Sequence, residues 1–145
     1  MNTPSHSAAK PSVPRKQSLA GVRLRKHADY QQAYAAARKH QSSSMSWFLA
    51  AQAPGARLES SRIGLTAGKV LGKAHDRNRI KRRIREVLRR HVDLLPGGVD
   101  MIFHPRRTVL TMDFAKLEAE IVRILRQAAT EALRLGAGAS ARAAS

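Results

Sequence analysis

Positive charge in this chain is crowded into one stretch of fourteen residues, 77–90. The stretch holds eight lysines and arginines and one acid, Glu86, in a chain whose formal net charge is +17. Its apolar residues follow one another at spacings of four, three and one, which gives a single stripe on a helix. The residues of that stripe are Ile80, Ile84, Val87 and Leu88. We therefore predict a helix that docks on a core along a narrow face and presents a basic surface elsewhere.

The charges on this predicted helix repel one another. Like charges four residues apart destabilise an isolated helix by roughly 0.2–0.5 kcal/mol per pair, and Arg77, Lys81 and Arg85 form such a row. A polyanion against the face would relieve the repulsion, and arginine, which outnumbers lysine seven to one here, suits two-point contacts to phosphate. The alternative is a solvated charged face, but such faces usually mix both signs. The pattern favours nucleic acid as the partner.

Composition narrows the class of protein further. At 145 residues the chain has room for one domain with tails. The basic helix lacks the exposed apolar residues that membrane insertion needs, and no apolar run approaches the roughly 18 residues of a spanning helix. We expect a soluble protein with no membrane partner. The chain has no cysteine, which excludes disulfides and thiolate chemistry and is compatible with the reducing cytoplasm.

The composition of both ends of the chain predicts tails outside the folded domain. Residues 1–18 mix proline, serine, alanine and basic residues without an apolar period, which predicts a disordered basic arm. An organellar transit peptide has a similar composition and is the alternative. Residues 136–145 have the composition of a flexible linker. One domain is therefore expected over residues 19–135.

The periodicity of the domain predicts an α+β fold with one layer of helices on a sheet. The expected elements are, in order, a helix over 28–39, strands over 45–51 and 61–67, the basic helix, a strand over 99–105 and a helix that opens near Thr111 or Asp113. Gly64 interrupts the second strand and suggests a close approach by another group. Residues 68–73 form a turn rich in glycine and lysine without the spacing of a nucleotide-binding loop.

The polypeptide offers little for catalysis. The whole chain has only ten acidic residues. The three acids of its one acidic cluster, Asp113, Glu118 and Glu120, do not lie on the same face of a helix. Helix capping and the helix dipole account for that cluster. The six histidines show no metal-binding spacing, and His75 is read as a surface residue. We expect neither a catalytic residue nor a metal site in the protein.

The run GKVLGKAHDRNRIKRRIRE at residues 68–86 resembles the signature of the protein subunit of bacterial ribonuclease P. The core of that signature, R-N-R-I-K-R-x-I-R-E, is present without a gap at residues 77–86. The resemblance extends over residues 19–135 and leaves out both tails. It implies a two-layer α/β sandwich in which the basic helix lies in a left-handed βαβ crossover, against the general right-handed rule.

The resemblance also implies a function and a set of contact residues. The catalytic subunit would be RNA, which removes the 5′ leader of precursor tRNA with Mg²⁺ held mainly by RNA, and the protein would be monomeric before assembly and would broaden substrate specificity. The residues implied to face the catalytic RNA are Lys69, Lys73, Arg77, Asn78, Arg79, Lys81, Arg82 and Arg85. The residues implied to form a cleft for the single-stranded leader are Tyr30, Tyr34 and Phe48.

The leader assignment has support from the residues themselves. Tyr30 and Tyr34 are four apart and share a helix face, and stacking of bases on rings tolerates variable sequence. The alternative is that both tyrosines only cover the core. Two positions depart from the family pattern: Ala50 stands where another aromatic residue is common, and the pair His75-Asp76 puts an acid beside the basic surface.

Two other classes of protein compete with this interpretation. A basic ribosomal or nucleoid-type structural protein would explain the charge equally well, but it would leave the paired tyrosines without a role. A self-sufficient protein nuclease would need acids that the chain lacks.

Overall fold

The computed structural model describes residues 23–52 and 61–135, so both predicted tails lie outside the described residues. The strands are β1 (Arg38–Gln41), β2 (Met45–Ala51), β3 (Arg62–Leu65) and β4 (Val99–Pro105). The α-helices are α2 (His27–Ala36), α3 (Ala74–His91) and α4 (Phe114–Arg134). Short 3₁₀ turns lie at Lys69–Leu71, Val92–Leu94 and Arg107–Leu110. The α+β class expected from the sequence is confirmed.

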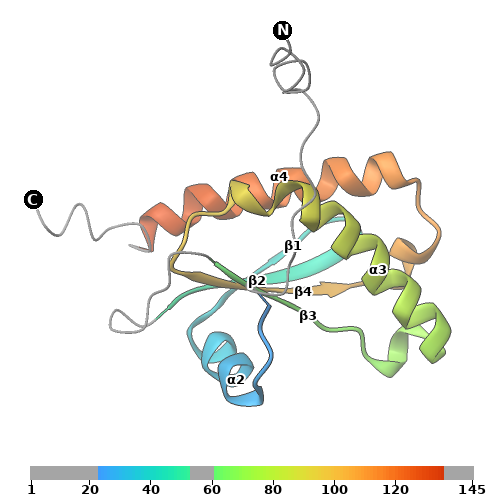
Figure 1. Ribbon diagram of the computed structural model, residues 1–145, viewed down its shortest axis with the longest axis horizontal. Helices are drawn as coiled ribbons and strands as arrows, with labels where there is room; N and C mark the ends of the chain where they lie inside the picture. Colours follow the sequence, from blue (N-terminus) through green and yellow to red (C-terminus); the bar gives the residue numbers. More distant parts are fainter. Residues whose placement is uncertain (1–22, 53–60, 136–145) are drawn as a thin grey trace, which may run out of the picture.

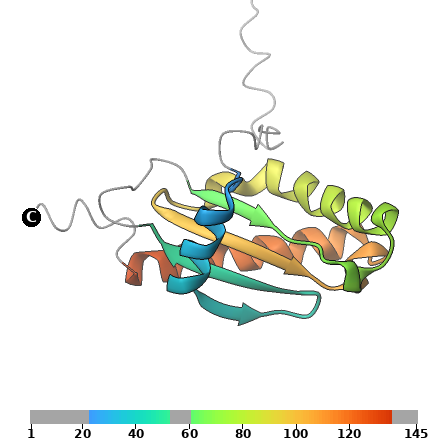
Figure 2. The same cartoon turned by 90° about the horizontal axis from the view of Figure 1, so that it is seen from below.

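The strands form one sheet in the order β1-β2-β4-β3. β1, β2 and β4 pair antiparallel, whereas β3 pairs with β4 in parallel, so α3 is the crossover between these two parallel neighbours. Figure 1 shows α3 and α4 over one face of the sheet and α2 beneath the other. Seen from below, α2 lies across the strands (Figure 2).

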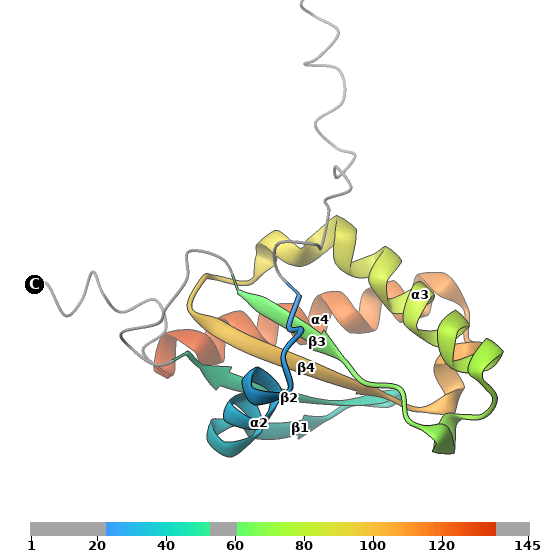
Figure 3. The ribbon, with the colours of Figure 1, turned by 60° about the horizontal axis from the view of Figure 1, so that its bottom comes forward.

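The main core lies between the sheet and the α3–α4 layer. Trp47 of β2 and Phe103 of β4 are both fully buried there. The apolar stripe predicted for the basic helix is confirmed, because all four of its residues, Ile80, Ile84, Val87 and Leu88, are 0–1% exposed. α4 docks beside α3 (Figure 3) and opens as expected after Asp113, whose carboxylate accepts a hydrogen bond from the Lys116 amide.

A second, smaller core lies between the sheet and α2. Ala33 of α2 packs with Ala50 of β2 and Ile102 of β4, and all three side chains are buried. Because Ala33 and Ala50 are both small, α2 can lie close to the sheet. The position where the family often has an aromatic residue is therefore a helix contact in this chain.

The expected helix over 28–39 was too long at its C-terminal end. α2 stops at Ala36, and the next residues enter β1, where Arg38 pairs with Leu49 and Lys39 with Phe48. Sheet pairing overrides the helix propensity of this basic segment. Gln41 also belongs to β1, because it pairs with Ser46.

Candidate nucleic-acid interface

The residues expected to contact folded RNA lie along the exposed side of α3 and the turn that precedes it. Those that are exposed are Lys69, Lys73, Asn78, Arg79 and Arg82. Those that are partly buried are Arg77, Lys81 and Arg85. The docked stripe leaves the opposite side of the helix with hardly any acid.

Most acids of the described residues have partners outside the set predicted to face RNA. Asp29 and Asp100 pair with Arg62, Glu131 with Arg38 and His40, Glu118 with Arg90 and His91, and Glu86 with Arg89 and Arg90. No ion pair within residues 23–52 and 61–135 includes any of the eight cations and amides predicted to face RNA. Their positive charge is therefore left for an external anion.

Asp76, the acid that departs from the family pattern, is neutralised within the protein. The Arg107 guanidinium lies 3.4 Å from its carboxylate and also donates to the Leu71 carbonyl at 2.6 Å. Gly72 makes room for this arrangement: its φ is +118°, and a Cβ there would collide with the Arg107 guanidinium. The acid thus helps to hold the turn before α3 and does not oppose the basic surface.

Arg83 is the arginine of α3 that the structure turns inward. Its guanidinium donates to the carbonyl oxygens of Val109 at 3.0 Å and Leu110 at 2.9 Å, and to that of Met112. It also lies 5.9 Å from the centre of the Phe114 ring. Its position off the apolar stripe predicts a place on the basic surface, but here Arg83 ties α3 to the segment that leads into α4.

The acids of the cluster that was assigned to helix capping have different roles in the structure. Asp113 caps α4 as expected, but Glu120 is buried and faces the turn between β1 and β2. Burial raises the pKa of Glu120, and hydrogen bonds from the hydroxyls of the three serines of that turn and from one amide outweigh it, so the net pKa is lowered. Capping was therefore the wrong explanation for Glu120, which anchors this turn.

An open aromatic cluster lies on the α2 face of the sheet. The Tyr34 and Phe48 rings meet edge to face with centroids 5.1 Å apart, and the His104 ring lies 5.7 Å from Tyr34 and 5.0 Å from Phe48. Tyr34 is 36% exposed. Lys39 adds a positive charge 5.8 Å from the centre of the Phe48 ring. We call Tyr34, Phe48, His104 and Lys39 the aromatic cluster; it joins exposed ring surface to a cation, as single-stranded nucleic-acid sites do.

His104 was not selected from the sequence as a functional residue. Alternation along β4 places it on the same side as Ile102, toward α2, and this is the signal that could have identified it. Burial lowers its pKa, and the charge of Lys39 lowers it further. A neutral imidazole results at pH 7, so Nε2 can accept a hydrogen bond from the Tyr34 hydroxyl at 2.6 Å.

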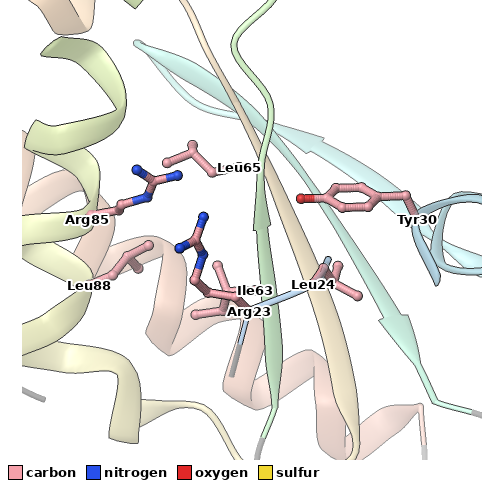
Figure 4. Close-up of a pocket in the computed structure, with 7 residues that line it drawn as sticks. All are labelled: Arg23, Leu24, Tyr30, Ile63, Leu65, Arg85 and Leu88. Carbon is pink, nitrogen blue, oxygen red and sulfur yellow. The ribbon is translucent and has the colours of Figure 1, made fainter. Parts of the chain in front are cut away.

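Tyr30 lies next to Tyr34 on α2, as expected, and its ring packs on β3. Its centroid is 6.4 Å from that of Tyr34, and its ring lies so close to Gly64 that a Cβ at residue 64 would come within 2.7 Å of it. The close approach predicted at Gly64 is therefore confirmed. The ring of Tyr30 covers the sheet, as the core alternative proposed, while its hydroxyl points across β3 toward Arg23 and Arg85 (Figure 4).

The described residues contain no group of three or more histidines and acids that could hold a metal ion. They also contain no helix long and apolar enough to cross a membrane. The chemistry that these residues support is binding of phosphate and of exposed bases.

Fold and surfaces together define a small basic α+β protein of the class that binds nucleic acid. The Ribonuclease P family model matches residues 20–129. The chain belongs to the ribonuclease P protein family.

Individual relatives agree with that assignment. The chain is 42% identical over 86 residues to the ribonuclease P protein component of Chloroflexus aggregans, a match that covers 59% of this chain and 63% of the relative. The protein component of Leuconostoc citreum is 31% identical over 106 residues, which cover 73% of this chain and 89% of that one. The first of these matches thus spans just under two thirds of the relative's length.

Solved structures show the same fold. The ribonuclease P protein of Thermotoga maritima superposes with a TM-score of 0.63 at 25% identity, covering 72% of this chain and 96% of that one. The protein of Staphylococcus aureus also gives 0.63 at 25% identity, covering 74% and 94%.

Proposed function

We propose that this chain is the protein subunit of a ribonuclease P holoenzyme that removes the 5′ leader from precursor tRNA. The exposed side of α3 binds the catalytic RNA, and the aromatic cluster binds the single-stranded leader. The observation that carries the proposal is that these two surfaces lie on opposite faces of one sheet (Figure 1). A single protein can therefore hold a folded RNA and an unpaired strand at the same time.

The α3 surface acts through charge and geometry. Its arginines can bind a phosphate through two parallel N–H donors, whereas Lys69, Lys73 and Lys81 act as point charges. If about six phosphates are engaged, the logarithm of the binding constant should fall with the logarithm of salt concentration at a slope of roughly −4 to −5. A nearly flat slope would contradict this electrostatic role.

The aromatic cluster acts by stacking. A base of any sequence can lie against the exposed Tyr34 ring, which suits a leader whose sequence varies between precursors. The hydrogen bond to His104 fixes the orientation of that ring, and Lys39 is close enough to meet a phosphate next to the stacked base. The protein therefore binds and positions the leader.

The hydrolytic step belongs to the RNA subunit in this proposal. Mg²⁺ is held mainly by that RNA, and the described residues supply no group of ligands for it. The polypeptide contributes binding and orientation, which enlarge the range of precursors processed. We further propose that the protein is monomeric before assembly and works in the cytoplasm.

Reconstitution tests the proposal directly. The purified protein, a bacterial ribonuclease P RNA and a precursor tRNA are combined at low Mg²⁺, and formation of the mature 5′ end is measured. The expected result is stimulated cleavage at the mature 5′ end. An absence of stimulation would favour a purely structural nucleic-acid-binding protein, and cleavage without added RNA would show a protein nuclease.

A charge-matched pair of variants locates the RNA-binding surface. Arg79→Gln combined with Lys81→Gln should impair assembly with the RNA subunit. Arg123→Gln combined with Arg126→Gln removes the same charge from exposed positions on α4 and should leave assembly nearly unchanged. Equal losses in the two double variants would mean that net charge, and not the α3 surface, controls binding.

A further inference from the structure

A small pocket lies at the β3 edge of the sheet, between α2 and α3. Its polar lining comes from Arg23, Tyr30 and Arg85, and its apolar lining comes from Leu24, Ile63, Leu65 and Leu88. Figure 4 shows the two guanidinium groups side by side, with the Tyr30 hydroxyl pointing at them across β3. Three hydrogen-bond donors from three segments of the chain therefore converge on one space. We call it the edge pocket.

The backbone holds Arg23 at this edge. Arg23 forms a parallel bridge with Ile63 of β3, and the Leu24 amide donates to the Ile63 carbonyl at 2.8 Å. The Leu24 side chain is 5% exposed, so the segment before α2 is anchored on both sides of its backbone. The backbone position of Arg23 is thus fixed by the fold, and the residue is exposed at the pocket mouth.

The core also positions the elements that carry the other two donors. Arg85 projects from α3 directly after Ile84, whose side chain is fully buried in the main core. Tyr30 is held by the contact of its ring with Gly64. A residue larger than glycine at position 64 would displace the ring and with it the hydroxyl.

The edge pocket has an unbalanced positive charge. No acid lines it, and neither Arg23 nor Arg85 has an ion pair within the described residues. Burial lowers the pKa of Arg85, and the charges of Arg23 and Arg89 lower it further. Two like charges held close together against apolar side chains destabilise the protein until an anion binds between them.

We propose that the edge pocket binds one phosphodiester group of an RNA strand, which accepts hydrogen bonds from the Arg23 and Arg85 guanidinium groups and from the Tyr30 hydroxyl. The mixed lining favours a phosphate whose ester oxygens and sugar face the leucine and isoleucine side chains. Because the partner is taken to be RNA, this inference rests on the proposed function. It assigns a phosphate contact to Arg23 and to the hydroxyl of Tyr30.

The pocket lies between the two proposed RNA surfaces, at the β3 edge of the sheet. Arg85 belongs to α3, which is proposed to bind catalytic RNA, and Tyr30 belongs to α2, which borders the aromatic cluster. The phosphate can therefore come from the catalytic RNA or from the leader. Both sources present the same chemical group, and binding experiments with each RNA separate them.

A titration of the full-length protein with inorganic phosphate tests the site itself. The Nε–Hε resonances of Arg23 and Arg85 are followed by NMR at constant ionic strength, with chloride as the balancing anion. Both resonances should move with one dissociation constant. Tyr30→Phe, which keeps the ring on Gly64 and removes only the hydroxyl, should raise that constant about threefold to tenfold.

Arg23→Gln should abolish the response of the Arg85 resonance. Arg123→Gln removes one charge from an exposed position on α4 and should leave the constant unchanged. The site would be refuted if Arg23 and Arg85 responded with unrelated constants, or if Arg23→Gln behaved like Arg123→Gln.

Binding of RNA by the same variants identifies the source of the phosphate. Loss of one contact should lower the magnitude of the log–log salt slope by roughly 0.7–0.9 and weaken affinity about tenfold. A loss seen with the ribonuclease P RNA assigns the phosphate to that RNA, and a loss seen only with leader-bearing precursor assigns it to the leader. Normal affinity of Arg23→Gln for both RNAs would overturn the proposal.

Failure of the pocket and failure of the proposed function give different results. If the pocket is wrong, the wild-type protein still stimulates 5′ processing and Arg23→Gln is equally active. If the function is wrong, the wild-type protein fails in reconstitution while the coupled response of Arg23 and Arg85 to phosphate persists.

Discussion

The Tyr34 hydroxyl lies 2.6 Å from Nε2 of His104, across the gap between α2 and β4. This contact joins two residues that are 70 positions apart in the chain, and it holds the exposed ring of the aromatic cluster. Protonation of the imidazole would reverse this hydrogen bond, because a charged imidazole donates from Nε2 and cannot accept.

Acidification should therefore destabilise the protein through His104. Its pKa is below the ordinary value of 6.5 in the folded state, so the unfolded chain takes up the proton first as the pH falls. The stability is fully present above pH 6.5 and is lost as the pH falls through the folded-state pKa. Thermal unfolding between pH 7.5 and 5.5 should show a smaller drop in Tm for His104→Gln than for the wild type.

One result of the pH experiment would contradict this prediction. Acidification also acts on the protein at other sites, so only the difference between the two proteins is informative. Parallel Tm curves for wild type and His104→Gln would mean that protonation of His104 is not disfavoured by folding.

Removal of the Tyr34 ring should weaken binding of the leader. Tyr34→Ala deletes the exposed stacking surface, and stacking of one base on an aromatic ring is worth roughly 1–3 kcal/mol, or about 5- to 150-fold in affinity. Equilibrium binding by the reconstituted holoenzyme should show this loss for precursors with a leader and no loss for leaderless tRNA. Equal losses for both would indicate that Tyr34 only supports the fold.

Tyr34→Phe separates stacking from the hydrogen bond to His104. The ring remains, so most of the leader affinity should remain too. A loss as large as that of Tyr34→Ala would show that the orientation given by His104 matters more than the area of the ring.

Gly64→Ala should destabilise the protein despite the low strand propensity of glycine. The added methyl group would lie within 2.7–2.8 Å of the Tyr30 ring and hydroxyl, and overpacking of this kind costs roughly 1–3 kcal/mol. Urea denaturation measures the loss. In combination with Tyr30→Ala, the methyl group should cost little further, so the two changes should be strongly non-additive. Additive losses would show that the ring does not press on residue 64.

Much of the fold could be predicted from periodicity. The stripe on α3, the opening of α4 at Asp113 and the strands β2 and β4 all carry local patterns. β1 does not, because its sequence RKHQ has no apolar period and becomes a strand only by pairing with β2. Periodicity also could not predict the order of the strands, because that order depends on contacts between distant segments.

The candidate site was harder to predict than the fold. The basic surface followed from charge spacing, but His104 joins its site through the order of the strands, and Arg23 joins its site through the bridge to Ile63. Spacing on a helix also could not separate Arg82 from its neighbour Arg83, because the segment that receives Arg83 lies 26 or more residues away.

Arg82 and Arg83 therefore offer a test in which two adjacent arginines should behave in opposite ways. Arg83→Gln removes charged hydrogen bonds to the Val109 and Leu110 carbonyls, which should cost roughly 1–3 kcal/mol of folding stability. Arg82 is exposed, so Arg82→Gln should leave stability nearly unchanged but lower the magnitude of the salt slope for binding of ribonuclease P RNA by roughly 0.7–0.9. Urea denaturation and binding at several salt concentrations measure the two effects. Because both variants lose one charge, net charge cannot explain a difference, and an unchanged salt slope in Arg82→Gln would remove this residue from the proposed interface.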